Sequence, residues 1–304
     1  MKDTALLVRD FCGSINCHVK IDEPMSLHST FKVGGPADVF ISPSEENQVS
    51  ALISYFKDHE IPYCILGKGS NILVCDAGIR GAVIHLGHRF SGISQYGEVM
   101  ECRAGTPLAQ LSYTAYQAAL TGIEFAWGIP GSVGGAAYMN AGAYGGEMKD
   151  ILISCRHVDH NGEMGEFAGS ELALGYRKSI YSGSDSCITS VKIQLKPGNK
   201  EIIKERMDEL FQRRKTKQPL EYPSAGSTFK RPEGYFAAAL IEQCGLKGKS
   251  VGGAMVSIKH SGFVINTGTA TCNDILRLIE IIKEEVLRQT GVTLECEIRF
   301  FGCD

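Results

Sequence analysis

The segment 128–145 constrains this chain more than any other, and its sequence is GIPGSVGGAAYMNAGAYG. It is rich in glycine and contains no charged residue. Glycine weakens regular helices and strands, and proteins use it where φ must be positive or where a ligand approaches the main chain closely. We therefore expect a loop whose backbone contacts a ligand, with a tightly packed loop that binds nothing as the alternative.

A second glycine-rich segment, 66–71 with the sequence LGKGSN, follows an apolar run at 63–66. Two such turns predict one large ligand whose phosphates lie against backbone N–H groups. The Walker loop is excluded because Gly69 follows Lys68 where that motif needs serine or threonine. The dinucleotide fingerprint is excluded as well, since it needs a glycine where Ile72 stands. The sequence thus indicates phosphate binding outside both common phosphate-binding folds.

Charge and composition narrow the class of partner. The 304 residues carry a formal net charge of −3 and no long run of lysine or arginine, which argues against nucleic-acid and membrane-surface binding. The N-terminus lacks a secretory signal, no apolar run is long enough to span a bilayer, and the 11 cysteines show no CxxC spacing. We expect a cytoplasmic protein with reduced thiols, small-molecule partners and no metal site.

Hydrophobic periodicity predicts an α+β protein without internal repeats, with a boundary at Pro197 and Gly198. An Asn161-Gly162 pair indicates a hairpin turn. Before the boundary, the pattern predicts helices at 44–57 and 107–120 and strands at 38–41, 63–66, 72–74, 82–86, 99–103, 151–159 and 187–195.

After the boundary, the pattern predicts helices at 201–215, 235–243 and 273–289 and strands at 254–258 and 263–265. The apolar face of the first helix is expected to consist of Ile202, Ile203, Met207, Leu210 and Phe211. The chain ends on a strict alternation that predicts a strand over 292–300, with Phe300 on the apolar face and Glu297 on the polar one.

Seven segments occur in the order and spacing of one known family. They are STFKVGGPAD (29–38), LGKGSN (66–71), AGTPL (104–108), GIPGSVGGAAYMNAGAYG (128–145), YRKS (176–179), PSAGSTFKRP (223–232) and LECEIRFFG (294–302). Together they resemble the UDP-N-acetylenolpyruvoylglucosamine reductase (MurB) family over nearly the whole chain.

The resemblance implies an α+β fold of the vanillyl-alcohol-oxidase (PCMH) type. Two α/β subdomains, 1–80 and 81–198, would hold FAD. A third, α+β domain, 199–304, would bind the substrate, and its C-terminal strand, about 292–304, would return to the active site. A monomer or weak oligomer is expected.

The resemblance also implies a reaction. NADPH reduces FAD, and UDP-N-acetylglucosamine-enolpyruvate is then reduced to UDP-N-acetylmuramate for peptidoglycan synthesis. Hydride addition to the β-carbon of the enol ether builds negative charge on the conjugated carboxylate. Stabilisation of that charge and an acid that protonates the α-carbon are therefore required.

Three catalytic residues follow from the family pattern. The acid is expected at Ser227 of AGSTFKRP, and the stabilising groups at Arg177 of YRKS and Glu297 of LECEIRF. Without the family motifs, a serine after glycine is usually a turn residue and an arginine beside a lysine is usually on the surface. Alternation alone does not separate Glu297 from Glu295.

The resemblance further implies cofactor and substrate contacts. Substrate contacts are expected from Tyr176 and Lys217. Arg231, which stands in the variable position after TFK, is a further candidate, to hold the UDP diphosphate. The tyrosine loop of the longer family branch is missing, so this chain resembles the shorter branch, and Tyr181 is not given that tyrosine's role. FAD contacts are expected from Gly67, Lys68, Gly69, Ser70, Asn71, Gly131, Ser132, Gly134, Asn140 and Gly142.

Two alternative functions remain open at this point. One is another FAD-dependent oxidoreductase of the same fold that acts on an alcohol or lactone. The other is a nucleotide-sugar binding protein without catalytic activity. The colour of the purified protein and its substrate profile distinguish the three functions.

Overall fold

The computed structural model describes residues 2–303, and the chain divides into two compact units. Unit 1 contains the chain up to Ile21 together with 38–68 and 81–213. Unit 2 contains 22–37, 69–80 and the chain from 214 onward. The expected three-domain division stays a prediction. The two glycine-rich segments are distributed between the units, because 128–145 lies in unit 1 and most of LGKGSN lies in unit 2.

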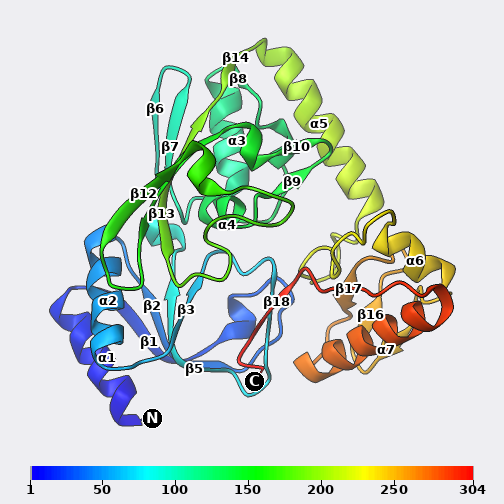
Figure 1. Cartoon of the computed structure of the whole chain (residues 1–304), viewed down its shortest axis with the longest axis horizontal. Coiled ribbons are helices and arrows are strands. Elements are labelled where there is room, and N and C mark those ends of the chain that lie inside the picture. Colours follow the sequence, from blue (N-terminus) through cyan, green and yellow to red (C-terminus); the bar gives the residue numbers. More distant parts are fainter. Residues whose placement is uncertain (1, 304) are drawn as a thin grey trace. The chain divides into compact units, whose positions relative to one another are not determined.

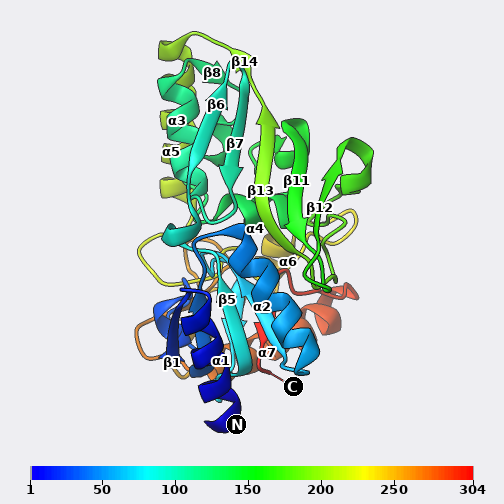
Figure 2. The ribbon, with the colours of Figure 1, turned by 90° about the vertical axis from the view of Figure 1, so that its left-hand side faces the viewer.

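A five-stranded antiparallel sheet forms part of unit 1, in the order β12-β11-β13-β7-β6. The predicted hairpin turn at Asn161-Gly162 is confirmed, and it joins β11 to β12, a strand that was not predicted; the N–H of Asp159 donates to the Glu163 carbonyl at 2.8 Å. In Figure 2 these strands form one layer, with α3 and α5 along one side of it. The elements are β6 Ile93–Tyr96, β7 Val99–Arg103, β11 Leu152–Val158, β12 Met164–Ala168, β13 Cys187–Gln194, α3 Leu108–Gln117 and α5 Lys200–Lys217.

A second sheet has the order β1-β2-β5-β3, and β3 pairs in parallel with β5. The side-chain oxygen of Gln48 accepts from the N–H of Ser44 at 2.7 Å and of Glu45 at 3.1 Å, so α2 begins at Glu46 rather than at the predicted Ser44. Figure 1 shows α1 beside α2 at this sheet. The elements are α1 Lys2–Ser14, β1 His18–Pro24, β2 Pro36–Ser42, α2 Glu46–Asp58, β3 Tyr63–Leu66 and β5 Ile79–His85.

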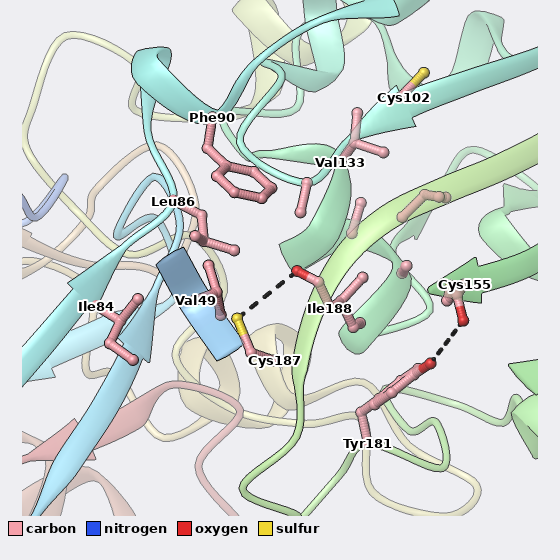
Figure 3. Close-up of a cluster of buried hydrophobic side chains, with 14 of the residues drawn as sticks. Val49, Ile84, Leu86, Phe90, Cys102, Val133, Cys155, Tyr181, Cys187 and Ile188 are labelled. Atoms are coloured by element: carbon pink, nitrogen blue, oxygen red, sulfur yellow. Dashed lines mark hydrogen bonds between the residues drawn. The ribbon is translucent and has the colours of Figure 1, made fainter. Parts of the chain in front are cut away.

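The core of unit 1 contains five of the cysteines, and Figure 3 shows three of them, Cys102, Cys155 and Cys187, among aliphatic side chains. Cys102, Cys155 and Cys187 are free thiols, and burial raises the pKa of each to about 12. At neutral pH these thiols are therefore protonated and act as small apolar groups.

Unit 2 contains a three-stranded antiparallel sheet, β15-β16-β17, and a separate parallel pair in which β18 joins β4. The long helix α7 begins after Thr271, whose side chain accepts from the N–H of Asp274 at 3.1 Å, and ends at Gly291 with φ 73°. The elements are β4 Ile72–Val74, α6 Ala237–Gln243, β15 Ser250–Val251, β16 Ala254–Val256, β17 Val264–Asn266, α7 Cys272–Thr290 and β18 Arg299–Phe301.

The structure corrects three of the sequence predictions. The C-terminal strand is limited to Arg299–Phe301, and Phe300 is 41% exposed instead of buried. On α5, Ile203, Met207 and Leu210 are buried as predicted, whereas Ile202 and Phe211 are exposed. The glycine tract is not all loop, because it contains the helix α4, Val133–Tyr138, and the strand β9, Gly142–Ala143, which pairs with β10, Gly146–Glu147, directly after the tract.

Candidate functional site

The start of α4 brings together two of the predicted cofactor-binding residues. Ser132 is the N-cap, and its Oγ accepts from the N–H of Gly135 at 3.4 Å. A Cβ placed on Gly67 would lie 2.3 Å from that same Oγ. Gly67 is therefore required for the Ser132 side chain to reach its capping position.

Further along the tract, two glycines are explained by close contacts within the protein. A Cβ on Gly134 would lie 2.7 Å from the Cβ of Ala104, and one on Gly142 would lie 2.7 Å from the carbonyl oxygen of Gly146. Both positions therefore need glycine whether or not a ligand is bound. The carbonyl of Gly131, near the start of the tract, accepts from the N–H of Leu108 at 2.9 Å.

Asn140 is completely buried and connects three parts of unit 1. Its Nδ2 donates to Glu147 at 2.8 Å and to the carbonyl of Gly175 at 2.9 Å, while its Oδ1 accepts from the N–H of Lys149 at 2.8 Å. Its side chain is therefore used within the protein, and its predicted contact with FAD stays a prediction.

Tyr176 and Arg177 form the tip of a tight turn that Asn140 holds. Gly175 and Lys178 exchange backbone hydrogen bonds of 2.9 and 3.2 Å across the turn. Arg177 has φ 54°, a conformation that is uncommon for residues other than glycine, and its guanidinium lies 5.2 Å from the ring centre of Tyr176. The turn presents both predicted substrate-facing side chains together.

The loop at Gly69 packs against the segment 28–35 inside unit 2. Gly69 has φ 64°, and a Cβ on it would lie 1.9 Å from the carbonyl oxygen of His28. Its own carbonyl accepts from the N–H of Thr30 at 3.0 Å. These contacts give the segment STFKVGG a structural role that the sequence did not reveal, which is to shape the LGKGSN loop.

The backbone N–H groups of Lys68, Gly69 and Ser70 have no acceptor within the described chain, residues 2–303. Three consecutive amide groups of this kind form a suitable site for an anion. The Lys68 side chain is exposed beside them and adds a positive charge.

In unit 2, the segments that carry Ser227 and Glu297 lie side by side. The N–H of Glu297 donates to the carbonyl of Thr228 at 2.8 Å, and the N–H of Lys230 donates to the carbonyl of Glu295 at 2.9 Å. Ser227 itself is exposed, and the preceding Gly226 has φ 76°. The two motifs AGSTFKRP and LECEIRF, far apart in sequence, are therefore hydrogen-bonded to each other.

Asn71 connects the LGKGSN loop to the segment that carries Glu297. Its Nδ2 donates to the carbonyl of Glu297 at 3.2 Å, and its carbonyl accepts from the N–H of Arg299 at 3.0 Å. The structure also separates the two glutamates that the sequence could not, because Glu295 forms an exposed ion pair with Lys230 at 3.0 Å while Glu297 is half-buried.

The remaining predicted substrate residues are exposed. Lys217 is the last residue of α5. The guanidinium of Arg231 lies 4.5 Å from the ring centre of Phe236, a neighbour that sequence reasoning did not identify. Over residues 2–303, no group of His, Cys, Asp and Glu side chains is arranged to hold a metal ion, and no helix is long and apolar enough to cross a membrane.

Two models of known protein families match parts of this chain. Residues 37–168 match a model described as an FAD binding domain. Residues 218–301 match a model described as UDP-N-acetylenolpyruvoylglucosamine reductase, C-terminal domain. The FAD-binding fold expected from the sequence is thereby confirmed.

Individual relatives match over most of the chain. A UDP-N-acetylenolpyruvoylglucosamine reductase of Clostridium novyi is 50% identical over 91% of this chain and 90% of its own. The enzyme of that name from Clostridioides difficile is 49% identical over 94% of both chains. The crystal structure of UDP-N-acetylenolpyruvylglucosamine reductase (MurB) from Thermus caldophilus has a TM-score of 0.79 at 36% identity, and the match covers 94% of this chain and 98% of that one.

Proposed function

This chain belongs to the UDP-N-acetylenolpyruvoylglucosamine reductase family, and on that basis we propose how its own residues carry out the reaction. The protein is an FAD-containing oxidoreductase. It reduces UDP-N-acetylglucosamine-enolpyruvate to UDP-N-acetylmuramate with NADPH, a step of peptidoglycan synthesis. Family membership favours this activity over both alternatives considered from the sequence.

The residues present fit the binding of FAD. The acceptor-free amide groups of Lys68, Gly69 and Ser70 suit its diphosphate, with Asn71, Gly131 and Ser132 as further contacts. Gly67, Gly134 and Gly142 allow the surrounding backbone to pack closely, whatever the ligand. Bound FAD supplies the redox chemistry that connects NADPH to the enolpyruvyl group.

The protein's own residues stabilise negative charge on the substrate and donate a proton to it. As the β-carbon accepts hydride, negative charge develops on the substrate carboxylate and the α-carbon becomes basic. The hydroxyl of Ser227 donates a proton to that α-carbon. An exposed hydroxyl on a turn fixed by Gly226 is free of competing packing, and this supports the assignment.

Arg177 and Glu297 stabilise the developing charge. The guanidinium of Arg177 pairs with the substrate carboxylate, because its planar fork can donate two parallel hydrogen bonds. Its uncommon φ of 54° at the tip of a turn is a local strain of the kind that functional residues carry. Glu297 is held by two main-chain contacts, through its N–H to Thr228 and through its carbonyl to Asn71.

Substrate is further bound by Tyr176, Lys217 and Arg231, with Arg231 on the UDP diphosphate. We assign the protein to the cytoplasm and to a monomeric or weakly oligomeric state. All 11 cysteines are free thiols, which fits a reducing compartment.

The hydrogen bonds between the segments of Ser227 and Glu297 carry this proposal, and stopped-flow absorbance of the flavin tests it. Ser227→Ala should be reduced by NADPH at nearly the wild-type rate. Its reoxidation by the enolpyruvyl substrate should slow by roughly 10² to 10⁴, the range for losing a general acid. Ser224→Ala, a half-buried serine three residues away, is the matched control and should leave both steps unchanged. Equal slowing of both steps in Ser227→Ala, at unchanged FAD content, would show that Ser227 shapes the site without donating the proton.

A further inference from the structure

Two cysteines of unit 2 lie in contact although 31 positions separate them in the sequence. The Sγ atoms of Cys272 and Cys303 are 3.9 Å apart. Cys272 is the first residue of α7, and Cys303 follows the last strand, β18. Figure 1 shows the C-terminal end of the chain beside the first turn of α7, which agrees with this contact.

The backbone on both sides of this contact is held in place. The carboxylate of Asp76 accepts from the N–H of Cys272 at 2.8 Å and from the N–H of Asn273 at 3.0 Å. On the other side, the N–H of Cys75 donates to the carbonyl of Phe301 at 2.9 Å, two residues before Cys303. Sulfur atoms in a disulfide are about 2.05 Å apart, so side-chain rotation has only a short distance to close.

The two thiols differ in their access to solvent. Cys272 is completely buried, whereas Cys303 is partly exposed. An oxidant from solution therefore reaches Cys303 first, and Cys272 is positioned to react with the product. Burial raises the pKa of both thiols, so the reactive thiolate is a minor species at neutral pH and oxidation is slow.

We propose that Cys272 and Cys303 form an oxidant-induced disulfide that ties the end of the chain to the first turn of α7. In the first step, the Cys303 sulfur attacks hydrogen peroxide, the O–O bond breaks, and a sulfenic acid and one water form. In the second step, the Cys272 sulfur attacks the sulfenic sulfur, the S–O bond breaks, and a second water leaves. The two thiols lose two electrons in total, and the peroxide gains them.

Such a link would protect the segment that carries Glu297. Strand β18 begins two residues after Glu297 and pairs with the short strand β4 in a two-stranded sheet. A covalent link at Cys303 would hold β18 close to α7 and reduce its fraying. The link would also close a loop in the unfolded chain, which lowers the conformational entropy of that state and so stabilises the folded one. The reduced form described here is the resting state, and peroxide converts it to the linked one.

The test uses the FAD-loaded full chain treated with hydrogen peroxide, followed by alkylation of free thiols and trypsin digestion without reductant. Cleavage after lysine and arginine places Cys272 in peptide 260–277, Cys303 in peptide 300–304 and Cys75 in peptide 69–80. We expect 260–277 joined to 300–304, lighter than the sum of the two by about 2 Da, and released by dithiothreitol. The melting temperature should rise by roughly 3 to 8 °C.

Two variants complete the design. Cys303→Ser lies near the chain end, should fold normally, and should show neither the linked peptides nor the rise in melting temperature. Cys75→Ser should retain both effects, because the proposed link does not involve Cys75, a thiol that also interacts with Cys303. The proposal is overturned if 300–304 is joined to 69–80, if both thiols remain open to alkylation, or if Cys303→Ser still gains stability.

Discussion

The Nδ2 of Asn140 donates to the main-chain carbonyl of Gly175 at 2.9 Å, so a buried amide in the glycine tract fixes the turn that carries Arg177. The turn is held on its far side as well, because the Oγ of Ser179 donates to the carbonyl of Tyr138 at 2.7 Å. The glycine tract thus holds the turn of one proposed catalytic residue, Arg177, through hydrogen bonds of its own.

Asn140→Ala should weaken the turn without touching substrate directly. We expect the reoxidation of the flavin by substrate to slow by about tenfold, and the free energy of unfolding to fall by roughly 1–3 kcal/mol, because buried partners lose their hydrogen bonds. Stopped-flow traces and urea titration measure the two effects. Asn273→Ala, an exposed asparagine of α7, is the control and should change neither. Wild-type reoxidation in Asn140→Ala would rule out a positioning role.

Arg177→Lys and Glu297→Gln should both impair the step in which charge develops on the substrate. Lysine retains the charge of Arg177 but not its two parallel donors, so we expect a loss of about 10² or more in the rate of reoxidation. Glu295→Gln is the matched control for Glu297→Gln, since Glu295 is exposed and paired with Lys230. Comparable losses in both glutamine variants would contradict the assignment of Glu297.

Gly131→Val should abolish the retention of FAD, because a branched Cβ would intrude where the backbone is proposed to meet the cofactor. The absorbance of flavin per mole of purified, folded protein is the measurement. Gly142→Val is not informative here, since its Cβ would already collide with the Gly146 carbonyl. A suitable control is Gly13→Ala, where a Cβ meets no atom within 4 Å. A yellow Gly131→Val protein with full FAD content would contradict the proposed contact.

Tyr181→Phe should destabilise unit 1 without affecting catalysis directly. Tyr181 is 1% exposed, and its hydroxyl donates to the carbonyl of Cys155 at 3.1 Å and lies 3.1 Å from Nδ1 of His157. Loss of the hydroxyl removes these buried hydrogen bonds, and we expect the free energy of unfolding to fall by about 1–3 kcal/mol. Urea titration checks this against Tyr96→Phe, an exposed tyrosine that should show no change.

The stability of the protein should decrease in mild acid in part because of His157. Burial lowers the pKa of this imidazole below the value of about 6.5 for an unfolded chain, although the Cys155 carbonyl and Asp159 oppose the shift. Between the folded and the unfolded pKa, the unfolded chain binds more protons. The stabilisation is therefore complete above pH ~6.5 and is lost as the pH falls through the lower, folded pKa.

His157→Gln should flatten this pH dependence. Urea midpoints at about pH 7.5 and about pH 5.5 give the slope for each protein. His59→Gln, an exposed histidine, should retain the wild-type slope. An unchanged slope in His157→Gln would assign the acid sensitivity to other groups.

Local signals were sufficient for many elements of the fold. The strands at 63–66, 72–74 and 99–103 have the predicted bounds, because short apolar runs between turn residues leave little choice of register. The alternation at the C-terminus led to a wrong prediction, because contacts distant in sequence decide the structure there. Its pattern is regular, but hydrogen bonds to Thr228 and Asn71 direct the backbone around Glu297, and Phe300 becomes exposed.

The candidate site depended on information that the sequence does not carry on its own. The sequence around Gly67 does not indicate that its missing side chain makes room for Ser132. The sequence around Arg177 does not indicate a positive φ. The helix α4 was missed because its glycines suggested a loop, whereas the Ser132 cap and the burial of Val133 and Ala137 stabilise it. These are tertiary effects, and they override local propensity.

The pairing of β4 with β18 sets the order of events while the protein is being made. Strand β4, Ile72–Val74, has β18 as its partner in a two-stranded sheet, and β18 begins 225 residues after Val74 (299 − 74 = 225). At a translation rate of 5–20 residues per second, the ribosome needs roughly 10 to 45 s to deliver that partner. During this interval the apolar strand β4, directly after the LGKGSN loop, lacks its native partner, so nascent chains are exposed to aggregation and chaperone binding until Arg299–Phe301 has been made.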